Sequence, residues 1–207
     1  MSISYDGSAY SGWQIQKDII SIQETIQNAL KTILKENIPI TAAGRTDAKV
    51  HAMGQVCHFV IEKLIDPNKI LYSLNCILPK DIRIIELKEV DLSFHARYSV
   101  KSKIYRYHIC KNIVQDPFTR FYSYKPNVKI DIDLLKKATT HFVGTQNFSS
   151  FANKQTQGSA AKKPIKTIFR IDVLEDDNNI ILEFEGDGFL YKMVRNIVGT
   201  LIDVASG

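Results

Sequence analysis

Segments with helical and strand periodicity alternate along this chain, and this alternation constrains the fold more than any single motif. Ser21 and Glu24 form an S-x-x-E capping box directly ahead of a periodic apolar run, which is typical of a helix start. Apolar residues then recur at helical spacing over residues 22–34. The other elements predicted in the first half are a strand at 54–62, a helix at 67–78 and a strand at 82–90.

The same pattern restarts in the second half. Residues 103–110, KIYRYHIC, alternate between two faces as a strand does, with Tyr105 and Tyr107 on one of them. A third helix is expected to begin near Asp133 and to end at Gly144. The remaining predicted elements are strands at 167–175 and 179–186 and a helix at 194–205.

Strand pairs interspersed with helices are typical of antiparallel sheets that carry helices on one face. We therefore predict an α+β fold made of two α/β subdomains, one over residues 1–95 and the other over 96–207. A polar, basic segment at 153–166 is expected to form an exposed loop, with positive charges at Lys154, Lys162, Lys163 and Lys166.

The composition allows an anionic binding partner and argues against disulfide-linked, zinc-binding, secreted and membrane-spanning proteins. The 207 residues carry 27 Lys and Arg against 22 Asp and Glu, a formal net charge of +5 that permits nucleic-acid binding without proving it. Three widely spaced cysteines without a CxxC pair argue against a disulfide framework or a zinc site and fit the reducing cytoplasm. We find no signal peptide and no apolar run of membrane-spanning length.

The stretch at 42–56, AAGRTDAKVHAMGQV, places charged and hydroxyl side chains between a helix and a strand. Its glycines allow tight backbone turns that can present Arg45 and Asp47 together. The four residues GRTD alone favour an ordinary turn, in which Asp47 bonds nearby backbone amides. The longer string is more informative than this short motif.

Residues 44–56, GRTDAKVHAMGQV, resemble the signature GRTDAGVHAxGQV of TruA-type tRNA pseudouridine synthases. Further segments match this family in its own order and extend the resemblance over nearly the whole chain. They are YDGSAYSGWQIQ at 5–16, FHAR at 94–97, KSKIYRY at 101–107 and FLYKMVRNIVGTL at 189–201.

The resemblance implies an isomerisation of uridine in RNA, in which the base is detached, turned and rejoined to the ribose through C5. This chemistry is redox-neutral and implies no metal and no organic cofactor. By the same resemblance Asp47 is the catalytic carboxylate. Whether it attacks C6 of the base, attacks the ribose or abstracts a ribose proton stays open, although a nucleophilic role requires its ionised form.

The resemblance also assigns substrate-binding roles to three other residues. Tyr105 is the aromatic side chain that stacks on the target base, with Tyr107 as its rival, although a core tyrosine is the ordinary interpretation of a strand position. Arg45 would displace the target nucleotide from its stem, where a phosphate contact is the alternative. Arg195 is the candidate cation partner of Asp47, where a surface arginine near a helix start is the alternative.

One position departs from the family signature, and two nearby histidines raise the separate question of a metal site. Lys49 stands where the family usually has glycine, which puts the geometry of the loop in doubt and adds a positive charge beside the substrate. His51 and His58 suggest a metal site, but no carboxylate or cysteine cluster with ligand spacing surrounds them. We therefore expect no metal.

The family resemblance implies a catalytic cleft between the two subdomains and a homodimer, with tRNA as the partner and uridines 38 to 40 of the anticodon stem-loop as targets. The chain stops soon after the last predicted helix, so the second subdomain is expected to be truncated at its C-terminal end. A catalytically impaired tRNA-binding protein on the same scaffold is the alternative. A hydrolase using a lone aspartate ranks below both, because glycosidases usually place two carboxylates at the bond.

Overall fold

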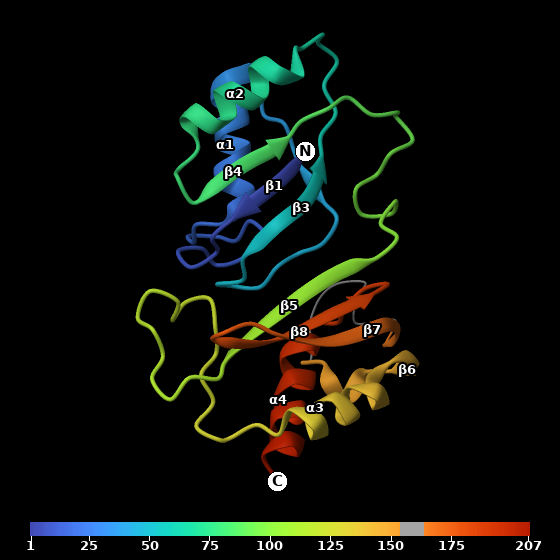
Figure 1. Cartoon of the computed structure of the whole chain (residues 1–207). Coiled ribbons are helices and arrows are strands. Elements are labelled where there is room, and N and C mark those ends of the chain that lie inside the picture. Colours follow the sequence, from blue (N-terminus) through green and yellow to red (C-terminus); the bar gives the residue numbers. More distant parts are fainter. Residues whose placement is uncertain (154–163) are drawn as a thin grey trace. The chain divides into compact units, whose positions relative to one another are not determined.

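A computed structural model describes residues 1–153 and 164–207 of the chain (Figure 1). The chain divides into two compact units, residues 1–100 and 101–207. Within the described residues, each unit contains a four-stranded antiparallel sheet and two α-helices. The predicted α+β fold is therefore confirmed.

The first unit arranges its strands in the order β2-β3-β1-β4, so that the N-terminal strand lies inside the sheet. This strand, β1, was absent from the sequence prediction, because the tetrapeptide SISY is short and half of it is serine. Neighbouring β3 and β4 both pair with it, and only this pairing reveals its place. The elements of the unit are β1 (Ser2–Tyr5), α1 (Ile22–Leu34), β2 (Thr41–Ala42), β3 (Ala52–His58), α2 (Pro67–Ile77) and β4 (Ile82–Glu86).

Both helices of the first unit begin at the predicted caps. The Ser21 hydroxyl accepts a hydrogen bond from the backbone N–H of Glu24, as the capping box requires. The Asp66 carboxylate accepts bonds from the first turn of α2, and Pro67 occupies the position where a missing N–H costs nothing. The two helices pack against each other and bury their apolar stripes in a core that also contains Trp13.

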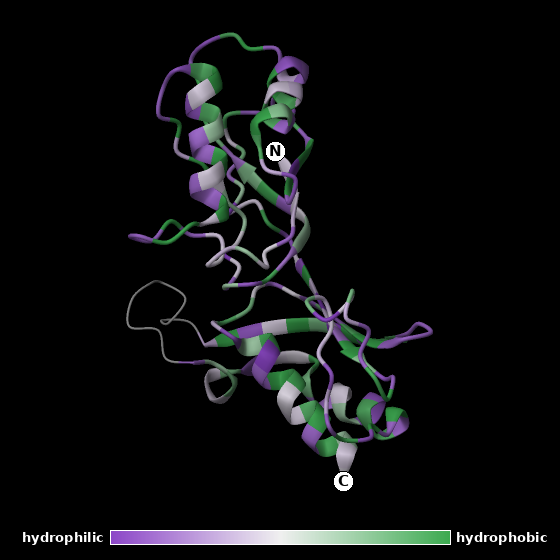
Figure 2. Ribbon diagram, turned by 90° about the vertical axis from the view of Figure 1, so that its left-hand side faces the viewer, coloured by the Kyte–Doolittle hydropathy of each residue, from purple (hydrophilic) through white to green (hydrophobic). Residues whose placement is uncertain are grey.

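The second unit has the strand order β5-β8-β7-β6, and helices α3 and α4 pack against each other. In Figure 2 the hydrophobic colour follows a stripe along α4, whose buried residues form much of the core of this unit. The elements are β5 (Lys103–Cys110), α3 (Ile132–Thr139), η1 (Thr140–Phe142), β6 (Gly144–Asn147), η2 (Ser149–Phe151), β7 (Ile165–Glu175), β8 (Asn179–Gly186) and α4 (Met193–Ser206).

The end of the third helix was predicted wrongly. The α-helix stops at Thr139, a 3-10 turn follows, and Gly144 opens strand β6 with a φ of 107°. The hydroxyls of Thr139 and Thr140 donate to backbone carbonyls of the last helical turn, and such bonds compete with helix continuation. The glycine therefore marks a strand start and not a helix cap.

The two faces of β5 agree with the predicted alternation. Tyr105 and Tyr107 oppose Phe184 and Leu182 of β8, which are both buried in the core. Arg106 lies on the other face opposite Glu183. Side chains at odd positions of β5 therefore pack towards the core, and those at even positions belong to a charged face.

A network of ion pairs covers that charged face of the sheet. Glu183 is only 6% exposed, and Arg106 and Arg170 donate to it at 2.5 Å and 2.6 Å. Arg170 also bonds Glu185 at 2.9 Å and pairs with Asp172. The hydrogen bonds from Arg106 and Arg170 lower the pKa of Glu183, which keeps this carboxylate ionised. The network links β5, the strand that carries Tyr105, to β7 through the glutamates of β8, which lies between them.

Candidate active site

The Asp47 loop, residues 43–51, connects β2 to β3 and is held at both of its ends. The backbone N–H of Ala43 donates to Val56, and the Gln55 side chain donates to the carbonyl of Gly44 at 2.9 Å. At the other end, the N–H of Val50 donates to the carbonyl of Asp47 at 3.2 Å and closes a turn. Asp47 itself is half-buried in this loop, so part of the residue is open to solvent.

Thr46, directly before Asp47, is anchored to the core of the first unit. Its carbonyl accepts a hydrogen bond from the backbone N–H of Trp13 at 3.0 Å, and its hydroxyl lies 2.8 Å from the hydroxyl of Tyr5. Trp13 and Tyr5 are both buried. Burial raises the pKa of Tyr5, so its hydroxyl keeps its proton and can serve in this bond.

Two glycines of the YDGSAYSGWQIQ segment allow it to lie against the Asp47 loop. A Cβ on Gly12 would stand 2.6 Å from the carbonyl oxygen of Thr46, and the φ of Gly12 is 94°. A Cβ on Gly7 would stand 2.1 Å from the carbonyl oxygen of Val50. Real Cβ atoms do not approach backbone oxygen so closely, so a side chain at either position would push the two segments apart.

His51 links the same two segments by a polar contact. Its Nδ1 lies 3.0 Å from a carboxylate oxygen of Asp6 and 3.2 Å from the backbone nitrogen of Gly7. A protonated ring can donate to the carboxylate, and a neutral ring can accept from the amide. Either form ties the loop to the N-terminal motif, which gives this histidine a structural use.

Lys49 has a φ of 63°, in the left-handed region that favours glycine. Its backbone N–H donates to the carbonyl of Tyr10 at 3.2 Å, which helps to fix this conformation. The departure from the family signature thus coincides with a position that prefers glycine. The loop nevertheless keeps its turn, and the side chain of Lys49 is exposed.

Arg45 and Asp47 therefore lie in one loop of the first unit, with Arg45 exposed. Tyr105 and Arg195 belong to the second unit. The ring of Tyr105 is half-buried and meets Phe189 edge-on, with 5.1 Å between ring centroids. Phe189 comes from the FLYKMVRNIVGTL segment and Tyr105 from KSKIYRY, so two of the motifs that carry the family resemblance meet at this ring.

Arg195 projects from the first turn of α4 and is exposed. Burial raises the pKa of the neighbouring Tyr107, and the positive charge of Arg195 acts on the same group in the opposite direction. Tyr107 also meets Tyr124 edge-on, with centroids 6.5 Å apart. Burial therefore has the larger effect on the pKa of Tyr107, the alternative to Tyr105 as the stacking residue, and the charge of Arg195 partly offsets it.

Several residues that contact the loop of Asp47 or the ring of Tyr105 have no role that the sequence predicts. The supporting residues are Tyr5, Gly7, Gly12, Trp13 and Phe189. All of them lie in the motifs that carried the resemblance, so the signal was present. Their contacts, however, are with residues far away in the chain.

The predicted basic loop falls mostly outside the described residues. Lys154, Lys162 and Lys163 lie outside the described residues, and Lys166 lies in β7.

In the parts of the chain that are described, no three His, Cys, Asp or Glu side chains gather into a group that could hold a metal ion. None of the described helices is long and apolar enough to cross a membrane.

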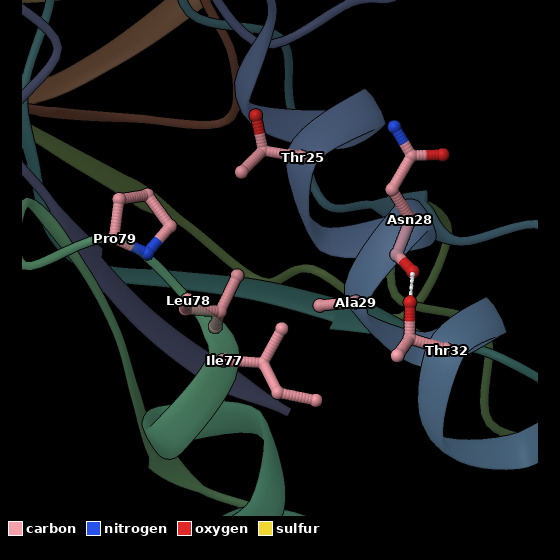
Figure 3. A pocket seen from close by; sticks show the side chains of 7 residues that line it. All are labelled: Thr25, Asn28, Ala29, Thr32, Ile77, Leu78 and Pro79. Atoms are coloured by element: carbon pink, nitrogen blue, oxygen red, sulfur yellow. Dashed lines mark hydrogen bonds between the residues drawn. The ribbon is translucent and has the colours of Figure 1, made fainter.

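A hollow between α1 and the end of α2 has a volume of about 240 Å³ (Figure 3). Polar side chains of α1 line one side, and Ile77, Leu78 and Pro79 line the other. It contains none of the residues predicted to act on the substrate. We assign it no catalytic part.

Comparison with known proteins identifies the family of the chain. A family model described as tRNA pseudouridine synthase matches residues 1–99 and 138–207. The chain therefore belongs to the tRNA pseudouridine synthase family. Asp47, Arg45 and Arg195 lie inside the matched segments, whereas Tyr105 lies between them.

Bacterial relatives match over almost the full chain. It is 52% identical over 207 residues to a protein named tRNA pseudouridine synthase A 1 from Protochlamydia amoebophila, covering 100% of this chain and 81% of the relative. It is 42% identical over 205 residues to tRNA pseudouridine synthase A of Acetivibrio thermocellus, covering 99% and 83%. The protein of the same name from Chlamydia felis is 41% identical over 206 residues, covering 98% and 76%.

Proposed function

We propose that this protein isomerises uridine to pseudouridine in tRNA and that Asp47 is the catalytic carboxylate. The observation that carries the proposal is the Asp47 loop, which holds a half-buried carboxylate on a buried scaffold within the family signature. Membership of the family supports tRNA as the substrate. The family's relatives that match this chain carry the name tRNA pseudouridine synthase A.

The reaction is balanced without a cofactor. The bond between ribose C1′ and uracil N1 breaks, the base rotates, and a bond forms between C1′ and C5. The proton on C5 is lost and N1 gains one, so that the product is an isomer of the substrate. A carboxylate serves this sequence as a nucleophile at C6 or C1′, or as a base at the ribose.

The fixed backbone around Asp47 suits any of these roles. A carboxylate assists a breaking bond only while it stays within contact distance of the reacting atoms, and small displacements cost large factors in rate. The bonds that hold Thr46 and Val50 limit the movement of Asp47, which lies between them. We therefore assign the Tyr5–Thr46 contact to positioning of Asp47.

Three further residues complete the proposed substrate contacts. Tyr105 stacks on the target base, and its edge-on contact with Phe189 holds the ring in place. Arg45, exposed on the loop of Asp47, enters the space left by the displaced nucleotide. Arg195, exposed at the start of α4, contacts the negatively charged substrate.

The finer assignments follow from the family resemblance. We propose that the targets are uridines 38 to 40 of the anticodon stem-loop and that the protein works as a homodimer in the cytoplasm. Three cysteines that are free in the structure are compatible with a reducing compartment. Sedimentation equilibrium measures the oligomeric state directly.

Release of tritium from tRNA that carries 5-³H-uridine tests the enzymatic proposal. Unmodified protein should release tritium, and Asp47→Asn should abolish release while binding tRNA with nearly unchanged affinity. Asp177→Asn, a matched change in the exposed turn between β7 and β8, should leave turnover intact. A protein that binds tRNA without releasing tritium would instead be the non-catalytic scaffold. Substantial turnover by Asp47→Asn would remove this residue from the mechanism.

A further inference from the structure

Residues 111–124 form a closed loop between β5 and α3, which we name the aromatic loop. It leaves the end of β5 and returns beside the same strand (Figure 1). The backbone N–H of Cys110 donates to the carbonyl of Tyr124, and the N–H of Tyr124 donates to His108, both at 2.8 Å. A surface loop of this length with its ends joined is a common carrier of function.

The interior of the aromatic loop is fixed by its own hydrogen bonds. The carboxylate of Asp116 accepts from the N–H of Phe118 at 2.8 Å, and the Gln115 side chain donates to the carbonyl of Ser123 at 2.8 Å. The N–H of Tyr122 donates to Thr119 at 2.9 Å. A side chain at the tip is thus presented in a defined place, which lowers the entropy lost on binding.

Large rings at the tip of this loop face solvent. Phe118 is 85% exposed, Phe121 59% and Tyr122 51%. Phenylalanine is normally buried, and a cluster of exposed rings marks an interaction surface more often than a lone exposed residue does. The loop therefore offers flat aromatic faces to a partner.

Positive charge is interleaved with these rings. The guanidinium of Arg120 lies 4.0 Å from the ring centroid of Phe121 and stacks on it. The charged residues of the aromatic loop are Lys111, Arg120 and Asp116, which give it a net charge of +1, and Lys125 follows it directly. Rings interleaved with cations are typical of surfaces that bind unpaired nucleotides, because bases stack and phosphates pair with the cations.

The size of the loop argues against a protein partner docked here alone. A stable protein interface takes about 20–30 residues from each side. The aromatic loop supplies fourteen, numbered 111 to 124. A short stretch of unpaired nucleotides needs far less surface.

We propose that the aromatic loop is an additional tRNA contact, in which Phe118 and the stacked pair Arg120–Phe121 hold unpaired bases of the substrate. This proposal rests on tRNA being the substrate of the enzyme. The loop lies between the two segments that match the family model. The contact increases the affinity for tRNA and takes no part in the bond changes at the target uridine.

Equilibrium binding of unmodified tRNA to the full chain tests this contact without requiring turnover. Phe118→Leu keeps an apolar side chain and removes the ring, and Phe118→Trp keeps a ring. Loss of stacking on one base corresponds to a Kd raised by about 5- to 150-fold. We expect a rise of this order for Phe118→Leu and for Arg120→Ala, and little change for Phe118→Trp. Tyr72→Leu, at an exposed ring on α2, is the control and should bind tRNA normally.

Two results would overturn the proposal. The first is an unchanged Kd for both Phe118→Leu and Arg120→Ala. The second is a loss of affinity that accompanies dissociation of a dimer in sedimentation equilibrium, because the loop would then bind a second copy of the chain. Tritium release by the unmodified protein tests the enzymatic proposal separately. A failure of that activity is therefore distinguishable from a failure of the loop to bind.

Discussion

The hydroxyl oxygens of Tyr5 and Thr46 lie 2.8 Å apart, which joins an inner strand of the first sheet to the residue before Asp47. Forty-one residues separate them in the chain. Because Tyr5 is 3% exposed, water cannot replace the bond easily. The contact thus ties the loop of the proposed catalytic carboxylate to a strand inside the sheet.

Removal of the Tyr5 hydroxyl should lower kcat clearly while it reduces the free energy of unfolding only slightly. Tyr5→Phe is expected to reduce the free energy of unfolding by about 1 kcal/mol, the usual value for one hydrogen bond, and to lower kcat because Asp47 loses support. Urea titration and single-turnover tritium release measure the two effects. Tyr10→Phe is the matched control, since its hydroxyl bonds Asp81 at 2.8 Å and not the loop. Equal loss of kcat in both variants would contradict a positioning role for Tyr5.

A methyl group at Gly12 should separate the two motifs that meet there. Its Cβ would stand 2.6 Å from the Thr46 carbonyl, at a φ of 94° that other residues rarely adopt. We expect Gly12→Ala to lower the free energy of unfolding by about 1–3 kcal/mol, the cost typical of such strain. Gly54→Ala, where a Cβ meets nothing within 4 Å, should cost much less. Denaturant titration of both variants checks the difference, and equal costs would exclude the close approach as its cause.

Replacement of Lys49 by glycine should stabilise the loop. A residue with a Cβ in the left-handed region is destabilised by roughly 1–2 kcal/mol, and glycine avoids this strain. Glycine also loses more conformational freedom on folding, which offsets about 0.5–1 kcal/mol of the gain. The expected net gain for Lys49→Gly is therefore about 0.5–1 kcal/mol in the free energy of unfolding. Lys49→Gln removes the charge and keeps the strain, so it should affect tRNA affinity without this gain. A stabilisation of equal size in Lys49→Gln would assign the effect to charge.

Substitutions at Tyr105 separate its ring from its hydroxyl. If the ring stacks on a base, Tyr105→Phe should bind tRNA about 5- to 150-fold more tightly than Tyr105→Leu, the range expected for one stacked base. Fluorescence anisotropy with labelled tRNA measures both affinities. Because Tyr105 packs on Phe189, the melting temperature of each variant must be compared as a control. Equal affinities would favour a purely structural tyrosine.

Acid should destabilise the first unit through His58. Its Nδ1 accepts a bond from the N–H of Ala96 at 3.2 Å, and its ring centroid lies 4.7 Å from that of His95. Burial chiefly lowers the pKa of His58, with contributions in the same direction from the charges of His95 and the N-terminal amine, while a bond to the Thr41 backbone opposes them. The unfolded chain therefore binds a proton more readily than the folded one.

Because the unfolded chain binds the proton more readily, the free energy of unfolding falls as the pH falls. The stability from His58 is complete above about pH 6.5, the ordinary histidine value, and is lost as the pH falls through the lower pKa of the folded state. Urea titrations at pH 7.5, 6.5 and 5.5 should show this decline, and His58→Asn should make it shallower. Burial also lowers the pKa of His108, so part of the slope should remain. An unaltered slope in His58→Asn would exclude His58 as a source.

Local sequence predicted those elements whose signals lie within one turn or one strand. The capping side chains of Ser21 and Asp66 bond amides two or three residues away, so their patterns specify helix starts without reference to the rest of the chain. The alternation of β5 likewise identified the face that carries Tyr105. The motif around Asp47 indicated the chemistry, because it resembles the family signature over many residues.

Tertiary structure decided the features that depend on distant partners. The tetrapeptide of β1 becomes a central strand only because β3 and β4 pair with it. Gly144 could have capped a helix or opened a strand, and its pairing with Ile168 of β7 selected the strand. The rigidity of the Asp47 loop comes from contacts such as that between Tyr5 and Thr46. A hydrogen bond between residues that are far apart in sequence leaves no local pattern. The sequence therefore predicted Asp47 as the carboxylate, whereas the contacts that hold its loop are decided by the fold.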